Sequence, residues 1–282
     1  MKMCLGFLLS KAMPGRTAEV KDSFTLHYWG GGKAETRVGE KVEALIRFYV
    51  ANTDNAASGG EKLEMLHKDF WRSKIDLDWY DNSSDRFERE LLPELIPLVE
   101  KLKGILAPTN IETVCEIGTG DGRFLSYLRE VLQQPIRYIG IDLSADRMDF
   151  NRKTYPDTQF VSGDAFEWIT SQSSDNTLYV TNGGVLEYFT QRALESLLSH
   201  IAREQSGGML AFFHEPLVPD HDLAKHFSSR LTSAGEYSFS HNYPHLIETA
   251  GFAIRHQQEA FEPMGYPPGC RTMTIFAEVK NP

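Results

Sequence analysis

The second half of the chain alternates between short apolar runs and amphipathic stretches. The apolar runs predict strands over 112–117, 137–142, 158–162, 177–182, 208–214, 251–257 and 271–279. Helical periodicity predicts helices over 122–132, 145–154, 165–171, 187–203 and 242–250, with another near 219–231. Strand and helix in succession imply right-handed crossovers and a largely parallel sheet. The last segment, 271–279, alternates as an antiparallel edge strand does.

This succession predicts an α/β fold with a doubly wound, seven-stranded, mostly parallel sheet and an antiparallel last strand. The first part of the chain has weaker periodicity. Within it, residues 85–104 carry apolar side chains at three- and four-residue steps, at Phe87, Leu91, Leu95, Leu98 and Leu102. This spacing indicates an amphipathic helix, with Pro93 and Pro97 marking a start or a kink. We therefore predict two parts, a mainly helical N-terminal region over 1–105 and an α/β domain over 106–282.

Composition narrows the classes of protein. The chain has 282 residues, 41% of them hydrophobic, and a formal net charge of -10 without a basic run, which argues against an extended nucleic-acid footprint. No stretch approaches the roughly 20 apolar residues of a membrane span. The cysteines Cys4, Cys115 and Cys270 are too widely separated for a disulfide framework or a metal-ligand pair, so we predict a cytoplasmic protein. A homo-oligomer stays open.

A glycine-rich turn follows the first predicted strand of the α/β domain. The sequence runs Thr-Val-Cys-Glu-Ile-Gly-Thr-Gly-Asp-Gly over 113–122, with Glu116 before Gly118, Gly120 and Gly122. Glycines permit positive φ and close approach of a ligand at the carboxyl end of a strand, where doubly wound sheets bind ligands. The dinucleotide fingerprint is GxGxxG, whereas this turn reads GxGxG. A carboxylate beside the ligand suits a cationic amino-acid group better than a pyrophosphate.

Two further acidic residues follow the next two predicted strands. Asp142, with Leu143 after it, is placed to accept hydrogen bonds from two ribose hydroxyls, a feature that fits NAD equally well. Asp164 follows the third strand and can accept a hydrogen bond from the exocyclic amine of adenine. Ala165 and Phe166 are placed to flank the adenine ring.

Together these segments resemble the first three motifs of class I S-adenosylmethionine-dependent methyltransferases, and the resemblance extends over about residues 110–280. It implies that Glu116 and Gly118, with Gly120, hold the methionine end, Asp142 the ribose and Asp164 the adenine. Asn182 ends the fourth predicted strand, which matches the motif that borders cofactor and substrate. Residues 246–252 look like the late helix that leads into the family's sixth strand.

The resemblance reaches the N-terminal region through a short segment, 79–87. It resembles the tyrosine-aspartate segment that lies over the cofactor in many small-molecule methyltransferases, and it implies that Tyr80 lies near the sulfonium or carboxylate end. Aromatic residues are candidates for an apolar lid or for an ordinary core: Tyr28, Trp29, Phe70, Trp71 and Trp79.

The cofactor determines the reaction class. An SN2 transfer from a sulfonium needs an aligned and partly desolvated nucleophile, and a general base only where the acceptor arrives protonated. Candidate bases at strand ends and before the late helix are His214, His241, Tyr243 and Glu187, each of which can equally be a cap or a packing residue. Pro244 interrupts the spacing of His241 and His245, and we identify no set of metal ligands.

We therefore predict an S-adenosylmethionine-dependent methyltransferase that transfers a methyl group to an oxygen or nitrogen of a small molecule without a metal, leaving S-adenosylhomocysteine. The sequence Asn182-Gly183-Gly184 stands where amine-methylating nucleic-acid enzymes carry an Asp/Asn-Pro-Pro-Tyr motif. One alternative is a non-catalytic S-adenosylmethionine-binding regulatory or partner protein. The other, an NAD-dependent oxidoreductase, is disfavoured by the glycine spacing.

Overall fold

The structure is a computed structural model that describes residues 87–133, 136–172, 175–231, 238–264 and 270–280, together with Gly60, Glu61, Glu64, Met65, His67, Lys68, Trp71 and Arg72. The strands are β1 (Thr113–Ile117), β2 (Arg137–Asp142), β3 (Gln159–Ser162), β4 (Thr177–Asn182), β5 (Met209–Leu217), β8 (Phe252–Phe261) and β9 (Arg271–Val279), with a separate pair β6 (Arg230–Leu231) and β7 (Phe239–Ser240). The helices are α6 (Leu92–Leu106), α7 (Arg123–Leu132), α8 (Ala145–Thr154), α9 (Ala165–Ser171), α10 (Gln191–Glu204) and α11 (Tyr243–Thr249). A π-helical turn, Phe87–Leu91, precedes α6, and a 3-10 turn, Leu186–Tyr188, precedes α10.

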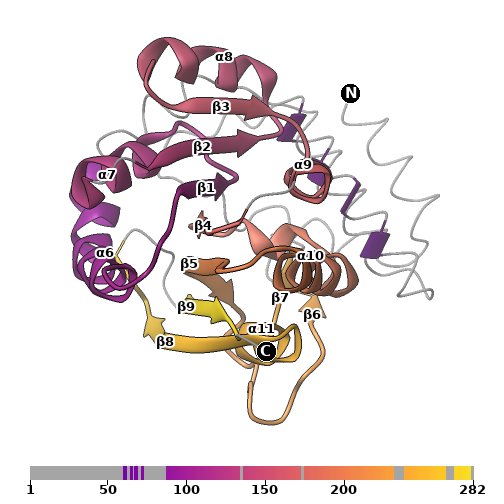
Figure 1. The fold of residues 1–282 in the computed structure, drawn as a ribbon. Helices are drawn as coiled ribbons and strands as arrows, with labels where there is room; N and C mark the ends of the chain where they lie inside the picture. Colours follow the sequence, from indigo (N-terminus) through magenta and orange to yellow (C-terminus); the bar gives the residue numbers. More distant parts are fainter. Residues whose placement is uncertain are drawn as a thin grey trace, which may run out of the picture.

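Seven strands form one sheet in the order β3-β2-β1-β4-β5-β9-β8 (Figure 1). The pairs among β1 to β5 are parallel, and β9 is antiparallel to both of its neighbours. This arrangement confirms the predicted doubly wound, mostly parallel sheet with an antiparallel last strand. The strand order turns back at β1, so the carboxyl ends of β1 and β4 flank the place where such sheets bind ligands.

The prediction that β9 lies at the edge of the sheet is wrong. The strand lies between β5 and β8, and β8 takes the edge. The polar positions that suggested solvent are covered, since Thr272 and Thr274 are 1% and 3% exposed. Both threonines form hydrogen bonds with His214 on β5. Polar side chains can occupy an interior strand when their hydrogen bonds are satisfied. The alternation of polar and apolar residues does not show whether such partners exist.

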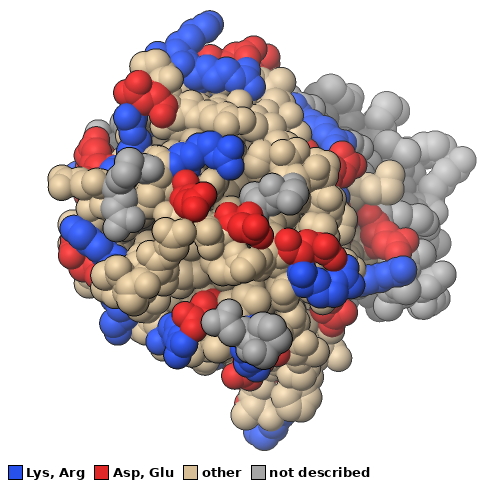
Figure 2. All heavy atoms as spheres, viewed as in Figure 1, with Lys and Arg blue, Asp and Glu red and all other residues tan. Residues whose placement is uncertain are grey.

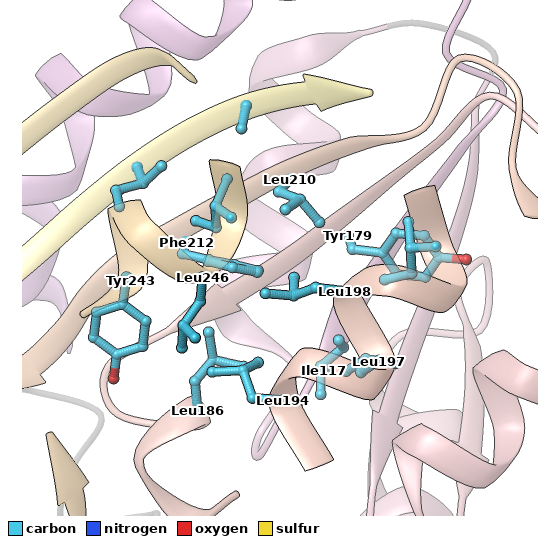
Figure 3. Close-up of a cluster of buried hydrophobic side chains, with 14 of the residues drawn as sticks. Ile117, Tyr179, Leu186, Leu194, Leu197, Leu198, Leu210, Phe212, Tyr243 and Leu246 are labelled. Carbon is cyan, nitrogen blue, oxygen red and sulfur yellow. The ribbon is translucent and has the colours of Figure 1, made fainter. Parts of the chain in front are cut away.

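Helices cover both faces of the sheet and bury a hydrophobic cluster on each. Leucines of α6 and α7 pack on one face with Val114, Phe213 and Phe276. Helices α9, α10 and α11 pack on the other, where Figure 3 shows Leu194, Leu197 and Leu198 of α10 among the buried side chains. Figure 1 shows these two sets of helices on opposite sides of the strands. Helix α6 thus packs on the sheet, while the division of the chain near residue 105 stays a prediction.

The prediction of a helix near 219–231 is wrong. This segment forms turns, and its last two residues make the short strand β6, which pairs with β7. The side-chain amide of Asn242 donates to the carbonyl oxygens of Leu223 and His226, at 2.7 and 2.9 Å. Because a helix would use those carbonyls for its own hydrogen bonds, the Asn242 side chain competes with helix formation here.

The surface carries charges of both signs. Figure 2 shows Lys and Arg side chains interspersed with Asp and Glu over the described part of one face, separated by uncharged areas. Among the described helices, none combines the length and apolarity that a membrane crossing would need.

Candidate active site

The glycine turn connects β1 to α7 and is built from left-handed backbone. Gly118, Gly120 and Gly122 have φ values of 69°, 52° and 75°. A Cβ at Gly118 would lie 2.8 Å from a methyl carbon of Val185, so both its conformation and its surroundings require glycine. The N–H groups of Gly118 and Thr119 donate to the carbonyl of Ile141 on β2, at 2.8 and 3.0 Å, which fixes the turn against the sheet.

Glu116 is a buried carboxyl inside β1. It is 3% exposed, and its Oε2 accepts a hydrogen bond of 2.6 Å from the hydroxyl of Thr119. Burial raises the Glu116 pKa from 4.5 to about 8; the Thr119 hydrogen bond lowers it, and repulsion from Asp121 and Asp142 raises it further. A buried carboxyl of this kind gains its charge when a cation arrives beside it.

Asp142 ends β2 and connects the glycine turn to the segment that follows. Its Oδ2 accepts from the N–H of Gly120 and its Oδ1 from the N–H of Ser144, each at 3.0 Å. Burial raises the Asp142 pKa, and these backbone hydrogen bonds oppose the increase. Each carboxylate oxygen offers two acceptor sites, so both can also accept from a hydroxyl group of a ligand.

Asp164 follows β3 and caps α9. Its Oδ1 accepts from the N–H groups of Phe166 and Glu167, and its Oδ2 lies 2.8 Å from the ammonium of Lys68. Lys68 also pairs with Glu64 at 2.9 Å. Burial alone lowers the Lys68 pKa, but the hydrogen bonds to the two carboxylates outweigh it and raise the pKa above its usual value. The N-terminal region therefore contacts the adenine end predicted for this site.

One cavity of about 340 Å³ opens beside these residues. Eight of the predicted cofactor residues line it: Glu116, Gly118, Gly120, Asp142, Leu143, Asp164, Ala165 and Asn182. Phe166 is not among the lining residues, and its ring packs against the hydrophobic cluster on the α10 face of the sheet. Tyr80 lies outside the described residues, as do four of the candidate lid aromatics, Tyr28, Trp29, Phe70 and Trp79. Trp71, the fifth, lines the cavity.

Among the four candidate bases, Glu187 is the one that lines the cavity. It belongs to the 3-10 turn after β4, is 3% exposed and lines the cavity. Its Oε1 lies 2.6 Å from the position a Cβ would take on Gly184, so this glycine makes room for the carboxylate. The next residue, Tyr188, meets the rings of His67 and Trp71 at centroid distances of 4.7 and 5.7 Å.

The structure places His214, His241 and Tyr243 outside the lining of this cavity. His214 is 4% exposed and bonds the threonines of β9, and burial lowers its pKa. Both ring nitrogens of His241 lie within hydrogen-bond distance of Ser229 and Leu186. Tyr243 is 2% exposed, and burial followed by repulsion from Glu215 and Glu187 raises its pKa well above 10. Among the described residues, no group of three or more His, Cys, Asp or Glu side chains is arranged to hold a metal ion.

Sequence reasoning missed Lys68, His67 and Glu215. The first two come from a stretch with weak periodicity and meet the site only through the tertiary fold. Glu215 adjoins the predicted His214, but its position under the turn depends on a β-bulge, which the strand pattern does not reveal.

The lining residues fit S-adenosylmethionine. Carboxylates at β1, β2 and β3 provide acceptors for an ammonium, a ribose and an adenine amine, and the glycine at 118 allows close approach of the ligand. Residues 114–205, which contain these carboxylates, match the family model of a methyltransferase domain. Together with the sheet order, this match shows that the chain carries a class I, Rossmann-like S-adenosylmethionine-dependent methyltransferase domain. It is an enzyme whose cofactor is S-adenosylmethionine and whose cofactor product is S-adenosylhomocysteine.

Comparison with other proteins gives more distant similarities. A TehB-like S-adenosylmethionine-dependent methyltransferase from Corynebacterium glutamicum is 18% identical over 65% of this chain and 87% of its own, with a TM-score of 0.40. Magnesium protoporphyrin IX methyltransferase from Synechocystis PCC 6803 is 12% identical over 84% and 99%, with a TM-score of 0.49. Geranyl diphosphate methyltransferase is 12% identical over 64% and 78%, with a TM-score of 0.48. No curated protein matches the chain in sequence.

Proposed function

We propose that this enzyme methylates an oxygen or nitrogen atom of a small molecule, without a metal, and that Glu187 accepts the proton that the acceptor loses. The observation that carries the proposal is the position of Glu187, a buried carboxylate that lines the cavity from the β4 side. The other lining carboxylates lie elsewhere: Glu116 in β1, Asp121 in the glycine turn, Asp142 at the end of β2 and Asp164 after β3.

A small acceptor is supported by the nature of the lining around Glu187. Aromatic and apolar side chains share this cavity, from the N-terminal region, the start of α6 and the 3-10 turn: His67, Trp71, Phe87, Leu91, Tyr188 and Phe189. Small-molecule pockets typically combine such walls with a few placed polar groups. The charges interspersed on the face in Figure 2 also give no support to a nucleic-acid acceptor.

Each group of residues has a separate part in the reaction. S-adenosylmethionine supplies an electrophilic methyl group on a sulfonium. Glu116, Asp142 and Asp164 hold the two ends and the ribose, so the methyl group keeps a fixed position. The apolar and aromatic side chains exclude water from the acceptor. Glu187 then orients the acceptor's O–H or N–H group and takes its proton, an effect typically worth about 10²- to 10⁴-fold in rate.

The other candidate bases lack this access. His214, His241 and Tyr243 do not line the cavity. His214 faces the threonines of β9, and His241 is fully buried behind the turn that carries Glu187. A cytoplasmic location belongs to the same proposal, on the evidence of the widely spaced cysteines.

Methyl transfer from S-adenosylmethionine labelled in the methyl group tests the proposal. The labelled cofactor is incubated with a panel of small phenols, alcohols and amines, and with carbon acceptors such as active methylene compounds. Label on an oxygen or nitrogen of a panel member is expected, while transfer to carbon alone contradicts the proposal. With the acceptor found, Glu187→Gln should lower kcat by about 10²- to 10⁴-fold. Glu195→Gln on the exposed side of α10 is the matched control, and equal kcat for both variants would refute the role of Glu187.

A further inference from the structure

The 3-10 turn that carries Glu187 is held by two buried side chains from other parts of the chain. The N–H group of Leu186 donates to Oε2 of Glu215 at 3.0 Å, and the carbonyl oxygen of Leu186 lies 3.1 Å from Nε2 of His241. Both polar groups of this residue are therefore bonded by side chains. Such bonds fix the backbone directly before Glu187, while Tyr188 after it packs on aromatic rings of the N-terminal region.

The hydrogen bonds of His241 determine its protonation. A carbonyl oxygen only accepts, so Nε2 must carry a hydrogen to bond Leu186. In the neutral ring Nδ1 then accepts, and the hydroxyl of Ser229, 2.6 Å away, donates to it. Burial lowers the His241 pKa to about 4, although hydrogen bonds to the backbone oppose this, so the ring is neutral near pH 7. With both nitrogens engaged and no exposed surface, His241 has no lone pair free for an acceptor.

Glu215 reaches the turn because of the bulge in β5. Phe212 pairs with Ile275 and Glu215 with Met273, so Phe213 and His214 together face one residue of β9, Thr274. Side chains normally alternate along a strand, so Phe212 and Glu215 would face opposite sides of a regular strand. The extra residue brings Glu215 to the same face as Phe212, beneath Leu186. There Oε2 of its carboxyl group accepts from the N–H group of Leu186. Burial raises the Glu215 pKa to about 7, and hydrogen bonds from Thr181 and the backbone of the turn oppose this increase.

We propose that Glu215 and His241 are positioning residues for methyl transfer, which hold the turn Leu186–Tyr188 so that Glu187 reaches the acceptor. This inference rests on the proposed role of Glu187 as the proton acceptor. Neither side chain lines the cavity, and the carboxylates that hold the cofactor lie at β1, β2 and β3. Loss of either bond should therefore move the acceptor half of the site and leave the cofactor half in place.

Amide hydrogen exchange and calorimetry test the inference without any acceptor. In Glu215→Leu and His241→Phe, exchange over residues 184–189 should rise about tenfold or more, because the bonds to Leu186 are gone. Exchange over 116–120 and the Kd of S-adenosylhomocysteine should stay within about threefold. Glu215→Gln and His241→Gln keep an acceptor and a donor, and they should restore most of the protection. His221→Phe is the matched control, since this histidine is also fully buried but bonds Ser240 instead of the turn.

The kinetic arm uses the acceptor found in the panel. Glu215→Leu and His241→Phe should lower kcat about 10- to 100-fold with an unchanged KM for S-adenosylmethionine, and the Gln variants should recover it. Unchanged exchange over 184–189, or an equal loss of kcat and cofactor affinity, would overturn the inference. If Glu187→Gln keeps full kcat, the proton-acceptor role fails, and the exchange data still decide whether these two residues hold the turn.

Discussion

The buried carboxyl of Glu116 predicts that cofactor binding releases a proton. With a pKa of about 8, this group is mostly protonated in the free enzyme at pH 7, by about 10 to 1. The ammonium of the cofactor favours the ionised form. If only the ionised form binds well, the Kd of S-adenosylhomocysteine should fall about tenfold from pH 6 to pH 7. About one proton should leave for each cofactor molecule that binds at pH 7.

The variant Glu116→Gln isolates this group. Glutamine keeps an oxygen that accepts from Thr119 but cannot ionise, so the proton release and its share of the pH slope should vanish. Isothermal titration calorimetry in buffers of different ionisation enthalpy measures the released protons directly. Asp121 and Asp142, whose pKa values burial also raises, remain in both proteins. The difference in proton release between wild type and variant therefore reports Glu116 together with its repulsion of these two carboxyls. A buffer-independent heat for the wild type at pH 7 would refute the reasoning.

The same shift governs the stability of the free enzyme. Folding raises the Glu116 pKa from 4.5 to about 8, so the folded state holds this proton more tightly than the unfolded chain does. The free energy of unfolding must then fall as the pH rises from 4.5 to about 8, because Glu116 ionises more readily in the unfolded chain. A variant without this carboxyl should not show that loss. In thermal unfolding without cofactor, the melting temperature of Glu116→Gln should accordingly rise relative to that of the wild type from pH 5 to pH 8. Parallel melting curves across this range would contradict the burial of an ionisable group here.

Three further predictions concern the cofactor residues and the core. Asp142→Ala should weaken S-adenosylhomocysteine binding by ~1–3 kcal/mol, or ~5- to 150-fold, and an unchanged calorimetric Kd would exclude the ribose role. Gly118→Ala places a side chain at φ 69° and against Val185, so it should lower both cofactor affinity and the melting temperature, by ~1–3 kcal/mol in stability. Leu198→Ala, at a site 1% exposed on α10, should cost ~2–5 kcal/mol in urea unfolding without changing the Kd of the cofactor product.

Most of the sheet could be predicted from the sequence because helices separate β1 to β5 along the chain, and β1, β2, β4 and β5 are largely buried. Apolar runs at 137–142, 177–182 and 271–279 coincide with β2, β4 and β9. The two wrong predictions, a helix near 219–231 and an edge position for β9, arise where polar side chains form hydrogen bonds that the sequence pattern does not reveal. Asn242 takes the carbonyls that a helix near 219–231 would need, and threonines of β9 that read as exposed bond His214 inside the sheet. Periodicity records which positions are apolar and not which polar groups find partners.

The cofactor half of the site was predictable for a geometric reason. Glu116, Asp142 and Asp164 lie on or directly after consecutive strands, and parallel strands bring their carboxyl ends to one edge. The sequence offers no such rule for Lys68, which pairs with Asp164 although the two residues are 96 positions apart in the chain. Contacts of that kind depend on how the N-terminal region packs, and a single sequence with weak periodicity does not encode them visibly.

The acceptor half depends on one strained residue of β5. His214 is a predicted base because it lies at the end of an apolar run, and in a regular strand Glu215 would face the side opposite to Phe212. In the structure His214 adopts φ 52°, in the left-handed region that non-glycine residues rarely take. That conformation creates the bulge, directs the histidine to β9 and brings Glu215 beneath the turn that carries Glu187. A conformation that costs energy persists only where its surroundings favour it, and here the hydrogen bonds to Thr272 and Thr274 do so. The bulge and the positioning of Glu187 are therefore one structural feature, and losing the threonine bonds should disturb both.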